Sequence, residues 1–225
     1  MRRTSQHQDR QGDHLRTRVA QAAAKLIAEG LTDYHAAKLK ALRQLNVTDQ
    51  NALPDNHEIE AALREYLTLF AGDTQPEVLT ALRHVALRAM RWLQIEAKAI
   101  VSNDEAPFEP WLTGAVLNGT ANEFSEIELE IIGVESKTIE FILLNRGVEF
   151  DLKEPNKNSA KSFKPSAAKA VPVQYHLEFE GAPLVITLFD NHAQRQATYP
   201  SGSIKHERMQ FAEAAKLFAA ENGKL

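Results

Sequence analysis

Three glutamates at alternating positions form the pattern in this sequence with the clearest chemical meaning. From 126 to 131 every second residue is apolar, and the residues between them are Glu126, Glu128 and Glu130. A period of two predicts a β-strand that carries all three carboxylates on one face. Carboxylates two residues apart on a strand lie about 7 Å apart, so they repel one another unless water, basic groups or divalent cations neutralise them.

Two interpretations account for this acidic face. In the first, the glutamates occupy the water-exposed side of a sheet that is covered only on its other side. In the second, Glu126 and Glu128 hold divalent cations, because carboxylate oxygens are the ligands that magnesium prefers. The residues upstream of the strand bear on this choice.

A glycine and a small hydroxyl residue precede the acidic strand. The sequence Leu117-Asn118-Gly119-Thr120 is expected to close a short apolar strand, and five residues separate it from Glu126. A glycine at such a position lets backbone N–H groups approach phosphate oxygens closely. Gly119 and Thr120 are therefore candidate phosphate-binding residues.

These two segments together resemble the nucleotidyltransferase superfamily, which includes DNA polymerase beta and the CCA-adding enzymes. That family has a Gly-Ser at a strand end, a loop of similar length, and then an Asp-x-Asp strand. The matching residues here are Gly119-Thr120 and Ser125-Glu126-Ile127-Glu128-Leu129. With a weaker match at the hairpin from Leu177 to Phe189, the similarity covers about Leu112 to Asp190.

The resemblance implies an enzyme that binds a nucleoside triphosphate together with Mg²⁺, or with Mn²⁺ in its place. Two metal ions would activate the attacking hydroxyl and neutralise the leaving pyrophosphate. Glu126 and Glu128 would be catalytic metal ligands, with Glu178 on a neighbouring strand as the third. The nucleotidyl group would pass to an acceptor that the sequence does not identify: a small molecule, a protein or an RNA.

The sequence departs from the family pattern at two points. Glutamate replaces aspartate at both metal positions, which lengthens each ligand by one methylene. Val185 falls where the family has its third carboxylate, so Glu178 is chosen from the paired strand, with Asp190 and Asp151 as more remote candidates. These departures motivate the alternative of a catalytically inactive nucleotidyltransferase-fold binding or regulatory module. A third interpretation treats the chain as an unrelated α+β protein.

The elements that would position this site predict an α+β fold, in which an N-terminal helical bundle precedes a small mixed-sheet domain. Residues 1–13 are expected to be a flexible polar tail. Residues 14–104 show helical spacing in four segments, and Asp55 with Glu58 forms a capping box at the third. Four amphipathic stripes favour an antiparallel bundle, which could also present a surface to a protein partner.

Residues 105–225 are assigned to the nucleotidyltransferase-like α/β domain. Pro107 and Pro110 mark the junction, and a helix from Glu135 to Arg146 follows the acidic strand. A strand at 148–152 precedes a lysine-containing loop at 155–170, which could contact a triphosphate or a nucleic-acid backbone. Val173 to Glu180 and Leu184 to Asp190 predict a hairpin. A last helix is expected from about His206 to Ala220.

Composition excludes several other classes of protein. The chain of 225 residues has no cysteine, which excludes disulfides, thiolate zinc sites and cysteine nucleophiles. No apolar run reaches the roughly 18 residues of a membrane span, and the first 13 residues lack the apolar core of a secretory signal, so a cytoplasmic protein without membrane contact is expected. Residues 1–99 carry a net charge of +2 and residues 100–225 one of −6, so nucleic-acid binding is not the default expectation. The histidines are dispersed, and no common phosphate-loop, dinucleotide-fold or esterase motif occurs.

Overall fold

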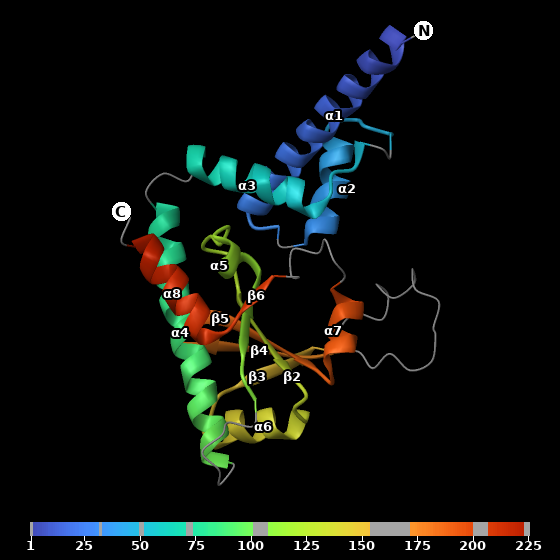
Figure 1. The fold of residues 1–225 in the computed structure, drawn as a ribbon. Helices are drawn as coiled ribbons and strands as arrows, with labels where there is room; N and C mark the ends of the chain where they lie inside the picture. The colour runs from blue at the N-terminus through green and yellow to red at the C-terminus, as the bar shows by residue number, and fades with distance from the viewer. Residues whose placement is uncertain are drawn as a thin grey trace. The chain divides into compact units, whose positions relative to one another are not determined.

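The computed structural model describes residues 2–31, 33–49, 52–70, 74–100, 108–153, 172–199 and 207–222. Within these ranges the chain forms helices and one six-stranded mixed sheet, which confirms the α+β class (Figure 1). The chain divides into two units. The first is helical and consists mainly of Met1–Val78 with Asn122–Ser125, and the second contains the sheet. None of the described helices is long and apolar enough to cross a membrane.

The helical unit is built from three helices around one core. They are α1 (Arg2–Ala28), α2 (Tyr34–Gln44) and α3 (Asn56–Phe70). Their apolar stripes meet in a buried cluster of small and branched side chains: Val19, Ala20, Ala23, Ala24, Leu26, Ile27, Ala37, Ala41, Ile59, Leu63 and Leu67. The alanines let the helix backbones approach closely.

Local polar contacts begin the helices of this unit. The Asp55 and Glu58 side chains each accept a hydrogen bond from the other residue's backbone N–H, at 2.8 and 2.6 Å, which confirms the predicted capping box. Asp33 caps α2 in the same manner, by accepting from the backbone of His35. Arg16 of α1 donates to both oxygens of Glu58 at 2.7 and 2.8 Å, so the cap also joins α1 to α3.

The N-terminal segment differs from its prediction. Residues 2–13 are expected to be a flexible tail, but in the structure α1 begins at Arg2. The prediction depended on an apolar stripe, and these residues are polar. A helix can continue through such a segment because it contains no proline, and Gly12 opposes the helix by only about 1 kcal/mol.

The sheet unit contains eleven segments of regular structure that follow Val78 in the chain. They are the remainder of α4 (Thr74–Ile100), β1 (Trp111–Thr113), α5 (Gly114–Asn118), β2 (Ile127–Ile132), α6 (Ser136–Asn145), β3 (Phe150–Lys153), β4 (Val173–Phe179), β5 (Ala182–Phe189), α7 (His192–Thr198), β6 (Arg208–Met209) and α8 (Phe211–Asn222).

The strands lie in the order β3-β4-β5-β2-β1-β6. The pair β2–β5 is parallel, and every other neighbouring pair is antiparallel. One face carries the apolar residues of the alternating strands and packs on α4, α6 and α8; its central members are Leu112, Ile127, Leu129, Ile131, Tyr175 and Ile186. Helix α7 lies against the opposite face, where its Arg195 pairs with Glu130 of β2 (Figure 1).

Helix α4 belongs mainly to the sheet unit, whereas the sequence analysis places it in a four-helix bundle that ends at residue 104. The predicted buried residues Ala86, Met90 and Leu93 are fully buried, but they lie in the same core as the strands. The division of the chain falls between Val78 and Leu79. An amphipathic stripe shows that a helix is covered and does not show by which partner.

Most of the predicted C-terminal elements are present, with shifted ends. Helix α6 and the β4–β5 hairpin match their predictions, but the hairpin turn is Glu180-Gly181, where both residues have positive φ (52° and 78°), and not Gly181-Ala182-Pro183. Helices α5 and α7 and strand β6 were not predicted. The proposed junction at Pro107 and the lysine-containing loop at 155–170 lie outside the described residues.

The assignment of α4 gives a direct prediction. Leu93→Ala, at a side chain that is fully buried, should lower the free energy of unfolding by about 2–5 kcal/mol through loss of apolar contacts and formation of a cavity. Urea denaturation monitored by the fluorescence of Trp92 and Trp111, which both belong to the sheet unit, measures the change. Ile95→Ala, on the exposed side of the same helix, is the control and should change it by less than about 0.5 kcal/mol. Equal effects of the two variants would contradict this packing.

Candidate functional site

The strand register gathers polar residues in one row across the face of the sheet that carries Glu128. Glu128 is the Cα partner of Thr113 on β1 and of Val185 on β5. Thr113 in turn pairs with Arg208, and Val185 with His176. The row therefore reads His176, Val185, Glu128, Thr113, Arg208. Cα partners share a face of the sheet, so these side chains lie on the side opposite the apolar core.

Glu130 is the most deeply buried acid of the three glutamates. Its side chain is 1% exposed and is paired with Arg195 of α7, itself 4% exposed. Arg195 donates to both oxygens of Glu130, through Nε to Oε2 and through Nη2 to Oε1 at 3.3 Å. A second cation, Arg208, places Nη1 3.9 Å from the Glu130 carboxylate. Glu130 is thus neutralised inside the protein and is not available to a ligand.

Arg208 is held between aromatic and charged groups. Its guanidinium lies over the ring of Trp111, 4.1 Å from the ring centroid, an arrangement that favours a cation. Burial lowers the pKa of Arg208 from its usual value, and the nearby positive charge of Arg195 lowers it further, whereas Glu130 raises it. An Nη2 atom of Arg208 lies 3.4 Å from Nδ1 of His192 at the start of α7. These contacts tie β6 to the site.

Glu126 lies just before β2 and is exposed to solvent. Its Oε1 is 3.8 Å from Nδ1 of His176, so a protonated His176 would form an ion pair with it. The other ring nitrogen of His176, Nε2, is buried and has no hydrogen-bond partner in the part of the chain that the structure describes. Glu126 and His176 form the outer, solvent-facing end of the polar row.

The glycine next to the carboxylates is Gly114, at the junction of β1 and α5. A Cβ atom at this position would lie 2.5 Å from Oε1 of Glu128 and 2.9 Å from its Cδ. The backbone at Gly114 also has a φ of 74°, which side-chain-bearing residues rarely adopt. Gly114 is therefore required by both its conformation and its contact with Glu128.

Gly119 and Thr120 occupy a different position from the one expected. They close the helix α5 and not a strand: Gly119 is the left-handed C-cap, and the N–H of Thr120 donates to Ala115 O at 3.0 Å. A Cβ at Gly119 would meet Arg83 of α4 at 3.6 Å and not an acidic residue. Thr120 is 2% exposed, which leaves no surface for a phosphate to contact.

Glu178 lies on β4, and its Cα partner on β5 is Pro183. Its side chain is exposed and shares a face with His176. Strand β5 separates it from β2, so its backbone is two strand spacings, about 10 Å, from the strand that carries Glu128. The structure brings His176, which is also on β4, to 3.8 Å from the carboxylate of Glu126, whereas Glu178 is exposed beside it on the same strand.

These donors do not fit the two-metal site implied by the family resemblance. Such a site needs at least three acidic or imidazole ligands around a common centre, and magnesium requires octahedral oxygen ligation. Among the described residues no group of three or more His, Asp or Glu side chains could hold a metal ion. The residue opposite Glu128 on the parallel strand is Val185, which offers no donor.

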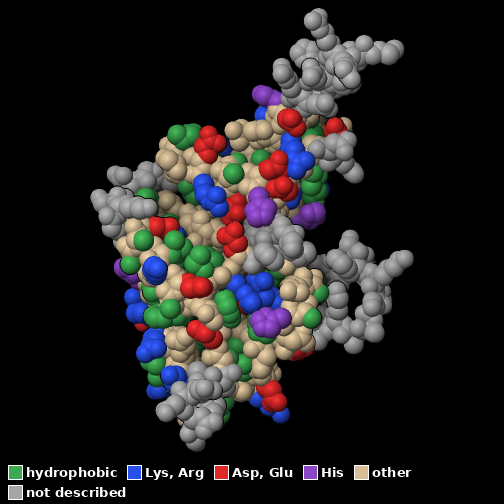
Figure 2. Space-filling view, viewed as in Figure 1, with side chains coloured by type: hydrophobic (Ala, Val, Ile, Leu, Met, Phe, Trp, Pro, Cys, Tyr) green, Lys and Arg blue, Asp and Glu red, His purple; other side chains and the backbone are tan. Residues whose placement is uncertain are grey.

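Sequence reasoning did not find Gly114, Arg195 or Arg208 as site residues. Arg195 and Arg208 are 65 and 78 residues from Glu130 in the chain, and neither lies in a motif. Gly114 carries a signal that could have been used, because it follows a short β-type run and precedes the acidic strand. On the face drawn in Figure 2, acidic and basic side chains of the described residues both occur.

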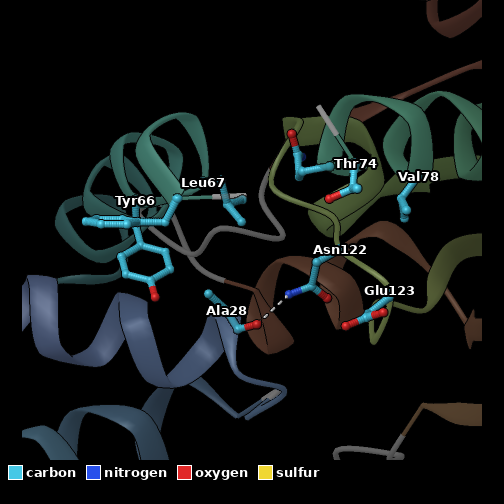
Figure 3. Close-up of a pocket in the computed structure, with 9 residues that line it drawn as sticks. Ala28, Tyr66, Leu67, Thr74, Val78, Asn122 and Glu123 are labelled. Carbon is cyan, nitrogen blue, oxygen red and sulfur yellow. Dashed lines mark hydrogen bonds between the residues drawn. The ribbon is translucent and has the colours of Figure 1, made fainter. Parts of the chain in front are cut away.

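The helical unit contains a separate hollow of about 320 Å³, between α3 and the loop at residues 122–123. Figure 3 shows Tyr66, Leu67 and Asn122 around it. The amide of Asn122 donates to Ala28 O at 3.4 Å, and its Oδ1 accepts from the backbone N–H of Phe124 at 3.0 Å. Asn122 thus holds its own loop in place.

In comparisons with known proteins, no family model, curated protein or solved structure gives a significant match to the chain. The candidate site is therefore interpreted from its own geometry.

The different environments of the glutamates predict different effects of the same substitution. Glu130→Gln should lower the free energy of unfolding by about 3–5 kcal/mol, because it leaves the buried Arg195 without its counter-charge. Glu126→Gln, four residues earlier and exposed, should change it by less than about 0.5 kcal/mol. Thermal and urea unfolding of the two variants side by side give the comparison. Similar losses in both would contradict the assignment of Glu130 as the buried structural acid.

Proposed function

We propose that the sheet unit is a catalytically silent, nucleotidyltransferase-like module that acts by binding and does not transfer nucleotidyl groups. In this proposal the acidic strand still resembles that of the nucleotidyltransferase superfamily. Its departures from the family pattern reflect the absence of metal-dependent catalysis. In this account the module serves as a scaffold for a partner, and its polar face carries out no metal-dependent chemistry.

The observation that carries the proposal is the pairing of Glu128 with Val185 in the parallel β2–β5 ladder. The family resemblance predicts a third carboxylate on this neighbouring strand, β5. Valine at that position is 5% exposed and contributes only apolar surface. Two glutamates without the third ligand cannot enclose a pair of magnesium ions, because each ion needs several oxygen ligands from the protein and the phosphates.

The environment of Glu130 supports the same conclusion. Of the three glutamates at 126, 128 and 130, this one is paired with Arg195 and lies near Arg208. A buried carboxylate paired with the buried Arg195 and close to the partly exposed Arg208 stabilises the attachment of α7 and β6 to the sheet. Glu126, the exposed acid that precedes β2, lies near His176.

One observation favours the active alternative, a metal-dependent nucleotidyltransferase that uses the nucleoside triphosphate and the acceptor described above. Gly114 and Ala115 follow a strand, as the Gly-Ser of the family does, and Gly114 lies against the carboxylate of Glu128. If the enzyme were active, Gly114-Ala115 would take the phosphate-binding role first given to Gly119-Thr120. The two candidates differ in whether pyrophosphate is released.

Calorimetric titration with Mg²⁺ and each of the four ribonucleoside triphosphates tests the proposal. At protein concentrations near 100 μM, about tenfold above a dissociation constant of 10 μM, the silent module should give no binding heat. Incubation with the same nucleotides should release no pyrophosphate. The double variant Glu126→Gln/Glu128→Gln should remain folded, with unchanged or slightly higher thermal stability, because the repulsion between neighbouring carboxylates is removed.

The active alternative predicts a different result. Release of pyrophosphate from any nucleotide by the wild-type protein, abolished in the double variant while its circular dichroism spectrum is unchanged, would establish the active alternative. His176→Gln provides a matched control on the same face, since it removes an imidazole without changing the number of carboxylates.

A further inference from the structure

Strand β3 (Phe150–Lys153) is an edge of the sheet with one side unpaired. It pairs with β4 through four Cα partners, and in the described part of the chain no strand pairs with its other side. An edge strand presents free backbone N–H and C=O groups and is a template for pairing with another chain. The other edge of the sheet is β6, which has only two residues and whose Arg208 is engaged in the polar row.

The side chains of this edge carry complementary charges. Asp151 and Lys153 are both exposed, and they lie on one face of the strand because they are two residues apart. Leu152 points to the opposite face and is 55% exposed, which is unusual for a leucine on a strand. The strand thus has one acid, one base and one exposed apolar residue in four positions.

An apolar surface continues from the strand onto α6. Leu144 at the end of that helix is 68% exposed. Together with Val148 and Phe150 it lines a hollow of about 450 Å³ between α6 and the start of β3. An exposed edge with an adjacent apolar surface is suited to a partner that adds a strand and covers the helix end.

We propose that this edge pairs with the same edge of a second copy of the chain, in an antiparallel arrangement with a two-fold axis at Leu152. In that register Asp151 lies opposite Lys153 of the partner subunit, and the pair is repeated by the symmetry. Leu152 meets its own equivalent on the other face. A two-fold interface requires a self-complementary patch, and this short sequence supplies one.

The neighbouring registers are less favourable. A shift of the axis to Asp151 would place that carboxylate opposite its own equivalent, and like charges directly opposite each other are destabilising. An axis between Asp151 and Leu152 would place each charge opposite an apolar side chain. The charge pattern therefore selects one register, which is the property that a specific strand pair needs.

Sedimentation velocity of the full chain over a range of concentrations up to about 200 μM tests the proposal, since weak strand pairing is expected to saturate in the micromolar range. The wild-type protein should show a monomer–dimer equilibrium. Asp151→Lys alone and Lys153→Asp alone should each weaken the dimer at least tenfold, because each places like charges opposite each other. The double variant Asp151→Lys/Lys153→Asp should dimerise like the wild type.

A mixture of the two single variants provides the sharpest readout. In the proposed register every charge of one variant meets the opposite charge of the other, so the mixture should form a heterodimer although neither variant self-associates. Circular dichroism and thermal unfolding confirm that each variant is folded. A wild-type protein that stays monomeric at all concentrations, or a dimer that the single substitutions leave unchanged, would overturn the proposal.

Discussion

The position of β2 in the interior of the sheet constrains everything else in this site. Ile127, Leu129 and Ile131 face the core formed with α4, α6 and α8, so alternation sends Glu128 and Glu130 to the opposite face. The environment of each glutamate then depends on which side chains the neighbouring strands and helices place beside it. Glu130 is paired with Arg195 and lies near Arg208, the carboxylate of Glu128 lies against Gly114, and the exposed Glu126 lies near His176. The three glutamates of one alternating sequence pattern therefore lie in three different environments.

The buried pair of Glu130 and Arg195 explains how the polar face is partly closed. A carboxylate removed from water is strongly unfavourable unless it is paired and hydrogen-bonded, and here a guanidinium donates to both oxygens. The pair fixes α7 on the sheet, and Arg208 brings β6 to the same level while it stacks on Trp111. The polar face is therefore stabilised by its own cations at the level of Glu130, while Glu126 beside His176 is exposed.

Much of the local structure could be predicted from the sequence, because it depends on short-range patterns. The alternation of β2, the capping box of Asp55 and Glu58, helix α6 and the β4–β5 hairpin all follow from neighbours within a few residues. The partner of α4 could not be predicted, since its stripe fits a bundle or a sheet equally well. The role of Gly119 differs from its prediction because the five-residue segment before it is too short to distinguish a strand from a helical turn. Arg195 and Arg208 reach Glu130 only through the tertiary fold.

In the proposed silent module, Val185 occupies the position opposite Glu128 where a third carboxylate would be required. Thermal unfolding with and without Mn²⁺ of the Val185→Asp variant, with Val185→Asn as a control of equal size, tests this requirement most directly. The account predicts that Mn²⁺ raises the melting temperature of Val185→Asp and leaves the wild type and Val185→Asn unchanged. A wild-type protein already stabilised by Mn²⁺, with the effect lost when Glu126 and Glu128 are both changed to Gln, would contradict it.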